Sequence, residues 1–146
     1  MGTRSLTTFI RQWKDEETNE VKQDEIVTMY RQFDGYPIGM GIDLAEFLCS
    51  GKMVNGIPIG NAEKERLFNG MGCLSAQAVA YFKDGPGGIY LYRGGTKDCW
   101  EEYRYEVIFD EDTRKLTMRC YDVYENNWIF DGEPKEFTEF AEASRK

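Results

Sequence analysis

The chain has 146 residues and a mass of 16.9 kDa, which is enough for one domain with a hydrophobic core. Hydrophobic residues make up 41% of it and aromatic residues 14%, a composition typical of folded proteins. The net charge of −8 argues against a protein that binds the nucleic-acid backbone, because such proteins carry a basic stripe. The absence of histidine excludes His-based triads, Cys–His dyads and His-ligated zinc.

The remaining composition offers little for metal or thiol chemistry. The four cysteines stand singly along the chain, without a CxxC pair, so we expect reduced thiols rather than a zinc site or disulfides. No apolar run approaches the length of a membrane span, and the first residues lack the apolar stretch of a signal peptide. We therefore expect a cytoplasmic protein without membrane contact, cofactor, metal or catalytic residue.

The N-terminal part of the sequence predicts a β-hairpin. Residues 3–11 are rich in β-branched and aromatic side chains and indicate a first strand. Residues 14–25 are mostly polar and predict the hairpin loop, and residues 26–32 predict a second strand, antiparallel to the first. The glycine- and proline-containing residues 33–41 predict a loop.

Helical patterns follow this loop. Asp43 is expected to cap a short helix that buries Leu44, Phe47 and Leu48. Residues 51–62 are loop-like, and residues 63–68 suit a polar helical turn.

Residues 73–83 form the strongest helical pattern of the chain. They are alanine-rich and apolar on most sides, which predicts a buried central helix. Residues 84–88 contain three glycines and a proline and are expected to end it.

The C-terminal part predicts strands and a last helix. Strands are expected at residues 89–92, 103–109 and 116–123, with a turn at 110–114, a short strand at 128–130 and a helix beginning at Pro134. Tyr105 and Val107 are expected to face one side of their strand, and Arg104 and Glu106 the other. The order of elements predicts a single α+β domain over residues 1–146, an antiparallel sheet with two to three helices packed on it.

The middle of the chain differs from its ends in glycine content and charge. Residues 26–97 hold 13 of the 15 glycines and carry a net charge of +1, while the remaining residues carry −9. Because glycines let backbone N–H groups approach a ligand closely, this region is the best candidate for binding a small anion.

Residues 29–37 are the first candidate site. Tyr30 and Tyr36 offer stacking faces, Arg31 offers a planar set of donors, and Gln32 and Asp34 suit a base or ribose edge. This combination is typical of sites for nucleotides or sugar phosphates. The alternative is that a strand end and an Asp-Gly turn need these residues for structure alone.

The second candidate is the N-terminus of the alanine-rich helix. Gly70 and Gly72 precede it, and free amides at a helix N-terminus bind phosphate well. The pattern is neither a P-loop nor a dinucleotide fingerprint. Close helix packing through small residues is the alternative.

The third candidate is the aromatic strand that begins at Gly87. Tyr90, Tyr92 and Arg93 are spaced for one face of the strand and its edge and could contact a ligand, but an aromatic strand between two turns is the favoured interpretation. The acidic residues 98–102 and 110–112 are most simply solvated turns, and no EF-hand spacing is present.

Five segments of the chain resemble a family of short bacteriophage and bacterial proteins. The similarity covers roughly residues 1–110, and the string Tyr-Arg-Gln-Phe-Asp-Gly-Tyr-Pro is its most specific part. The segments are residues 1–7, 29–37, 43–47, 69–74 and 87–92. Small phage proteins of this kind often counter host defence, and several are homo-oligomers that sequester cyclic nucleotide or ADP-ribose signals. By analogy, the resemblance implies an anti-defence role in the host cytoplasm.

The leading hypothesis is therefore a homo-oligomeric, non-enzymatic binder of a small nucleotide-derived immune signal. Tyr30, Arg31, Gln32, Asp34 and Tyr36 are expected to hold base and ribose, and Arg31→Ala to abolish binding without unfolding. Phosphate is expected to contact a second group of residues: Arg4, Tyr92, Arg93 and the amides of Gly70 and Gly72. Two alternatives stay open: an acidic inhibitor that mimics DNA or blocks a host enzyme, and a nucleotide-cleaving enzyme that uses Tyr, Arg and carboxylates.

Overall fold

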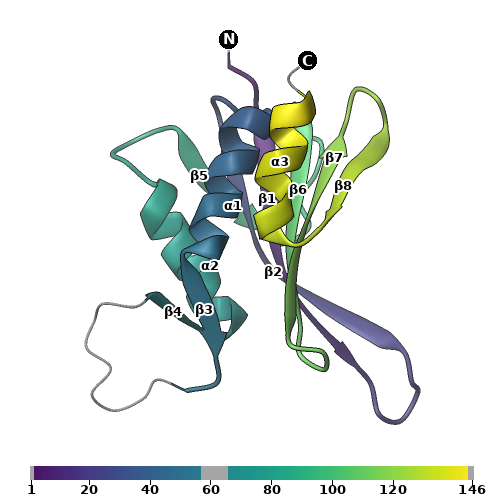
Figure 1. The fold of residues 1–146 in the computed structure, drawn as a ribbon. Coiled ribbons are helices and arrows are strands. Elements are labelled where there is room, and N and C mark those ends of the chain that lie inside the picture. Colours follow the sequence, from purple (N-terminus) through teal and green to yellow (C-terminus); the bar gives the residue numbers. More distant parts are fainter. Residues whose placement is uncertain (1, 57–65, 145–146) are drawn as a thin grey trace.

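The computed structural model describes residues 2–56 and 66–144, which form eight strands, three α-helices and one short π-helix (Figure 1). In chain order these are β1 (Ser5–Lys14), β2 (Val21–Arg31), η1 (Pro37–Gly41), α1 (Ile42–Cys49), β3 (Gly51–Val54), β4 (Arg66–Asn69), α2 (Gly70–Phe82), β5 (Ile89–Arg93), β6 (Tyr103–Asp110), β7 (Lys115–Asp122), β8 (Asn127–Gly132) and α3 (Pro134–Ser144).

Six of the strands form one sheet in the order β5-β2-β1-β6-β7-β8. All neighbours are antiparallel except β1 and β6, which run parallel in the centre. The strands β3 and β4 form a separate, parallel pair. The predicted α+β fold, a mostly antiparallel sheet with helices packed on it, is confirmed.

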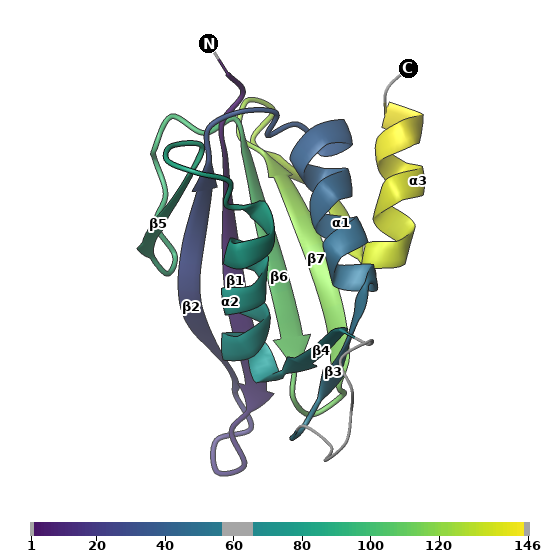
Figure 2. The ribbon, with the colours of Figure 1, turned by 90° about the vertical axis from the view of Figure 1, so that its left-hand side faces the viewer.

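All three α-helices cover the same face of the large sheet (Figure 2). This face is apolar because alternate residues of each strand point to it, among them Phe9, Met29 and Val107, which are fully buried. The helices contribute Leu44, Leu74 and Phe137 to the same core. The alternation predicted for residues 103–109 therefore describes β6 correctly.

The alanine-rich helix α2 is longer than predicted and less buried. It begins at Gly70 and packs over β1 and β2 through Met71, Leu74 and Ala78. Its opposite side, which includes Ala76 and Tyr81, is exposed, so α2 covers one face of the sheet and is not the buried central helix that the sequence predicts. Its small side chains allow close packing on the sheet on one side without requiring burial on the other.

Several local predictions are also corrected. The second strand begins already at Val21, because residues 21–25 pair with β1 although four of the five are polar. Arg66–Asn69 forms β4 rather than a helical turn, while residues 63–65 lie outside the described part. Asp43 lies in the first turn of α1 and is not its cap, since Gly41 occupies that position.

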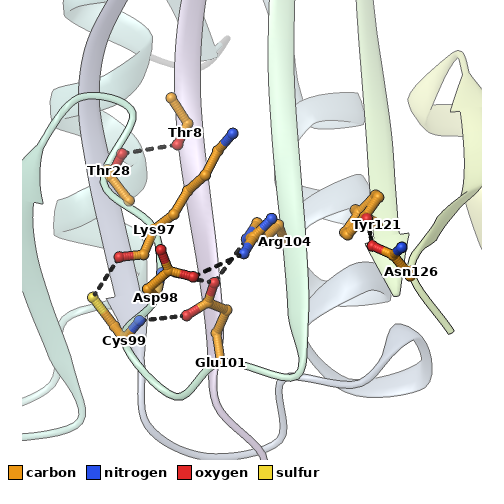
Figure 3. Close-up of polar contacts among 9 residues, drawn as sticks. All are labelled: Thr8, Thr28, Lys97, Asp98, Cys99, Glu101, Arg104, Tyr121 and Asn126. Carbon is orange, nitrogen blue, oxygen red and sulfur yellow. Dashed lines mark hydrogen bonds and ion pairs between the residues drawn. The ribbon is translucent and has the colours of Figure 1, made fainter. Parts of the chain in front are cut away.

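The face of the sheet without helices carries two transverse rows of side chains, one residue from each strand. The register places the first row at Tyr92, Thr28, Thr8, Glu106, Arg119 and Asp131. It places the second at Tyr90, Tyr30, Leu6, Arg104, Tyr121 and Trp128. Residues 94–102, here called the crossing segment, connect β5 at the sheet edge to β6 and pass over β2 and β1 on this face (Figure 3).

Candidate functional site

The crossing segment lies between two pockets on the face without helices. The first, called the aromatic pocket, has a volume of about 440 Å³ and is lined chiefly by Arg4, Tyr30, Gln32, Tyr90, Tyr92 and Trp100. The second, called the charged pocket, has a volume of about 220 Å³ and lies over β1, β6 and β7. Residues 98–100 of the crossing segment line the aromatic pocket, and residues 95–97 line the charged one.

Three tyrosines form the floor of the aromatic pocket. The ring of Tyr30 lies 5.8 Å from that of Tyr90 and 5.9 Å from that of Tyr92, in both cases edge to face. Tyr90 and Tyr92 are 46% and 41% exposed. They share a face because they are two residues apart on β5, and Tyr30 joins them because it pairs with Tyr90 across the strands.

Arg4 and Gln32 place polar groups at the border of this floor. Their backbones are fixed, since the carbonyl of Arg4 accepts from the amide of Glu102 and the amide of Gln32 donates to the carbonyl of Gly88. Within the part of the chain that the structure describes, neither side chain has a hydrogen bond or ion pair. The guanidinium of Arg4 is thus available to a phosphate or carboxylate.

Glu101 holds the crossing segment in place (Figure 3). Its carboxylate accepts hydrogen bonds from the amides of Asp98, at 3.2 Å, and Cys99, at 2.6 Å, and from Nε of Arg104, at 2.7 Å. The side chain is only 1% exposed. Burial by itself raises the pKa of Glu101, but the hydrogen bonds from Arg104 and the amides outweigh it, so the pKa lies below its ordinary value.

The conformation of the crossing segment is strained at two residues. Asp98 and Trp100 have φ angles of +62° and +65°, in the left-handed region that residues other than glycine adopt far less often. Trp100 is nevertheless 85% exposed and has no ring partner among the described residues; it lines the aromatic pocket and also a neighbouring pocket of about 410 Å³. Strain of this kind persists where surrounding contacts enforce it, and it gathers at ligand-binding sites.

Four of the predicted site residues meet in the aromatic pocket: Arg4, Tyr30, Gln32 and Tyr92. Sequence reasoning did not assign Trp100 to the site, because residues 98–102 were interpreted as a solvated acidic turn. A tryptophan inside that turn was the available signal. Only the crossing of the sheet brings it to the tyrosines.

Arg31 lies on the opposite face of the sheet from Tyr30. Its Nε donates to the carbonyl of Phe33 at 2.8 Å, and another guanidinium nitrogen lies 3.1 Å from the Asp43 carboxylate. It lines a different pocket of about 480 Å³, together with Phe82. Adjacent residues of a strand point to opposite faces, so Arg31 and Tyr30 do not share one pocket. Its contacts instead tie the loop after β2 to α1.

Asp34 and Tyr36 belong to the turn that follows β2. The hydroxyl of Tyr36 donates to the Asp34 carboxylate at 2.9 Å, and this bond raises the pKa of Tyr36. Asp34 has a φ of +58°, as an Asp-Gly turn allows. Tyr36 lines a further pocket, of about 460 Å³, beside α3. The structure thus supports the structural interpretation of this pair.

Gly70, Gly72 and Arg93 are also apart from the aromatic pocket. The two glycines lie at the N-terminal end of the 13-residue α2, roughly 20 Å from its C-terminal end beside β5 (Figure 2). A Cβ at either glycine would meet no heavy atom of another part of the chain within 4 Å, so close packing does not explain the two glycines, although the φ of +83° at Gly70 does favour glycine there. Arg93 follows Tyr92 on β5 and points to the other face.

The charged pocket contains a partly buried carboxylate. Glu106 and Thr8 are neighbours in register on β6 and β1, and Lys97 of the crossing segment faces them. Burial raises the pKa of Glu106, against the opposing effect of Arg119, whose guanidinium lies 3.2 Å from it. Sequence reasoning assigned no role to this group.

Comparison with models of protein families, with curated proteins and with solved structures found no match. Among the described residues, no group of three or more Cys, Asp or Glu side chains is arranged to hold a metal ion. Within the same part of the chain, no helix has the length and apolar character needed to cross a membrane.

Proposed function

We propose that the protein binds a small nucleotide-derived anion in the aromatic pocket and holds it without cleaving it. The observation that carries this proposal is the gathering of three tyrosines and an exposed, strained tryptophan around an arginine with no partner in the described structure. The planar faces suit a base, and the guanidinium of Arg4 suits a phosphate.

Stacking supplies part of the expected affinity. Base–aromatic stacking contributes about 1–3 kcal/mol per base, and the charge-assisted contact of Arg4 with a phosphate adds to it. Stacking tolerates different bases, and Gln32 at the border could distinguish their edges. The bonds from Glu101 to the amides of Asp98 and Cys99 hold the backbone that leads into Trp100, which lowers the backbone entropy that binding must offset.

The chemistry of the pocket favours binding over catalysis. Burial, followed by the charges of Glu101 and Asp98, raises the pKa of the Cys99 thiol, so its nucleophilic thiolate form is disfavoured at neutral pH. Asp98 is paired with Arg104. An arrangement for stacking and charge pairing, without an activated nucleophile, suits a protein that sequesters its ligand.

The resemblance to bacteriophage proteins suggests where such sequestration would act. A protein that removes a nucleotide immune signal from the host cytoplasm would protect an infecting phage, and assembly into a homo-oligomer would multiply the binding sites per particle. Both parts of this role are proposals that depend on ligand binding being demonstrated first.

Isothermal titration with cyclic mononucleotides, cyclic dinucleotides, ADP and ADP-ribose tests the proposal. We expect one ligand class to bind, Trp100→Ala and Tyr30→Ala to weaken it about 5- to 150-fold, and heat-released ligand to have an unchanged mass. The matched control is Tyr124→Ala, because the exposure of Tyr124 is similar to that of Trp100 but Tyr124 lies in the turn between β7 and β8. Absence of binding, equal weakening by the control, or a cleaved ligand would each contradict the proposal.

One observation favours the acidic inhibitor as a second candidate. The β6–β7 turn lies beside the end of β1, at the same end of the sheet as the β1–β2 hairpin loop (Figure 1), and there Arg11 bonds to Glu111 and the amide of Lys14 to Asp112. Acidic residues of both segments are thus gathered at one end of the sheet. If this candidate is right, the protein binds a basic protein partner, and duplex DNA competes with it for that partner. Replacing Glu16, Glu17 and Glu20 by Gln should abolish the binding of the partner.

A further inference from the structure

The polar groups of the charged pocket are of two kinds, those already engaged and those that are free. Glu106 accepts from Arg119 through Oε1, and the hydroxyls of Thr8 and Thr28 bond to each other at 2.8 Å. Arg104 is engaged by Glu101.

Three charged groups in the pocket keep open positions. The Lys97 ammonium and the Glu25 carboxylate have no side-chain hydrogen bond within the described residues, and Oε2 of Glu106 is likewise free. Glu25 lies directly beneath the crossing segment, since a side chain at Gly95 would come within 2.5 Å of its carboxylate.

This set of groups selects a hydroxyl-rich ligand. Two carboxylates accept hydrogen bonds from hydroxyls, and an ammonium group donates to hydroxyl or phosphate oxygens. A second anion would be repelled by Glu25 and Glu106. A second base would find no open ring, because the guanidinium of Arg119 already lies 3.6 Å over Trp128, which packs edge to face with Tyr121. A volume of about 220 Å³ admits a single sugar ring.

The two pockets are placed to hold two parts of one molecule. Along the transverse row, Tyr92 and Glu106 are three strand spacings apart, roughly 14 Å. Lys97 and Asp98 are adjacent on the crossing segment and line different pockets, so a ligand held in both pockets would pass over the segment at these two residues. Lys97 can neutralise phosphates on that path.

We infer that the charged pocket is a sugar subsite, and that the ligand is a nucleoside diphosphate carrying a second sugar. This inference rests on the proposed function, because the base and first phosphate occupy the aromatic pocket. Glu25 and Glu106 accept from vicinal hydroxyls of the second sugar, and Lys97 contacts the diphosphate.

Matched ligand pairs test the subsite: ADP against ADP-ribose, UDP against UDP-glucose, and GDP against GDP-mannose, each by isothermal titration. We expect the sugar-extended member of one pair to bind about tenfold more tightly than its parent diphosphate. Glu106→Gln should abolish this gain and leave binding of the parent diphosphate unchanged. Lys97→Met, at an exposed residue, should weaken both members, because Lys97 contacts the diphosphate.

The controls make the same chemical changes outside the pocket. Glu102→Gln and Lys52→Met alter exposed residues that line neither pocket, and both should keep the gain. Should Glu106→Gln lower the melting temperature, Glu25→Gln, at an exposed residue of the same pocket, replaces it. Equal affinity for parent and extended ligands, or a gain that survives both Glu variants, overturns the subsite while the proposed function stands. If no member of any pair binds and no cyclic nucleotide does, the proposed function fails as well.

Discussion

The buried carboxylate of Glu101 is expected to stabilise the fold more than any other single charge of the crossing segment. Glu101→Gln keeps the shape of the side chain but replaces one acceptor oxygen by an NH₂ group, which then faces a hydrogen-bond donor. Hydrogen bonds to charged groups contribute about 1.5–3 kcal/mol each, and the wild type has three. We expect the free energy of unfolding to fall by about 3 kcal/mol at pH 7.

The loss should depend on pH in a defined direction. The pKa of Glu101 in the folded protein lies below its ordinary value, so the folded state binds fewer protons than the unfolded state. Its contribution is therefore complete above the ordinary glutamate pKa and disappears as the pH falls through that value to the lower folded one. Gln does not titrate, so the difference between wild type and variant should be full at pH 7 and shrink below about pH 4.5.

Urea denaturation followed by tryptophan fluorescence at several pH values measures this difference. For a chain of this size, 3 kcal/mol corresponds to a decrease in Tm of about 6–12 °C. Glu102→Gln is the control, because its side chain is exposed next to the buried Glu101. Equal stability of wild type and Glu101→Gln at pH 7, or a difference that does not change with pH, would refute the reasoning.

Three further predictions concern the rest of the fold. Arg31→Ala should lower the free energy of unfolding, measured by urea denaturation, by about 1–3 kcal/mol, because the bonds to Phe33 and Asp43 are lost. The affinity for nucleotides should stay unchanged. An intact fold that no longer binds would instead support the ligand-binding role that the sequence predicts for Arg31. Gly94→Ala should lower the Tm, measured by calorimetry, far more than Gly72→Ala. A Cβ at Gly94 would overlap the carbonyl of Glu25, while a Cβ at Gly72 meets no other part of the chain. Equal Tm values for the two variants would contradict this. Tyr105→Phe should lower the free energy of unfolding by about 1–3 kcal/mol, because the buried hydroxyl donates to the carbonyl of Gly35 at 2.8 Å. In the wild type, ultraviolet titration should show one tyrosine that ionises at a higher pH than usual, since burial raises the pKa of Tyr105. A normal titration of all nine tyrosines would disprove the last point.

Local patterns in the sequence predicted most of the elements. The alternation at residues 103–109, the i, i+3, i+4 spacing of Leu44, Phe47 and Leu48, and Pro134 at a helix start are each encoded within a few residues. The predictions failed where pairing overrides local preference, as at residues 22–25, whose polar side chains are compatible with a strand because β1 lies beside them.

The candidate site was only partly predictable. Tyr30, Gln32, Tyr92 and Arg4 were identified from their chemistry, but grouping by proximity in sequence also included Arg31, Asp34 and Tyr36. Strand alternation directs Arg31 to the other face, and the turn after β2 carries Asp34 and Tyr36 away.

The sequence by itself determined the class of fold, the absence of imidazole chemistry and the supply of aromatic, arginine and amide side chains that the aromatic pocket contains. The tertiary structure decided which of these residues meet. Because β2 and β1 lie between β5 and β6 in the sheet, the chain must cross over both strands between β5 and β6, and that crossing brings Trp100 to the tyrosines and Lys97 to Glu106. A contact of this kind depends on the order of strands in the sheet, which no local pattern of side chains specifies.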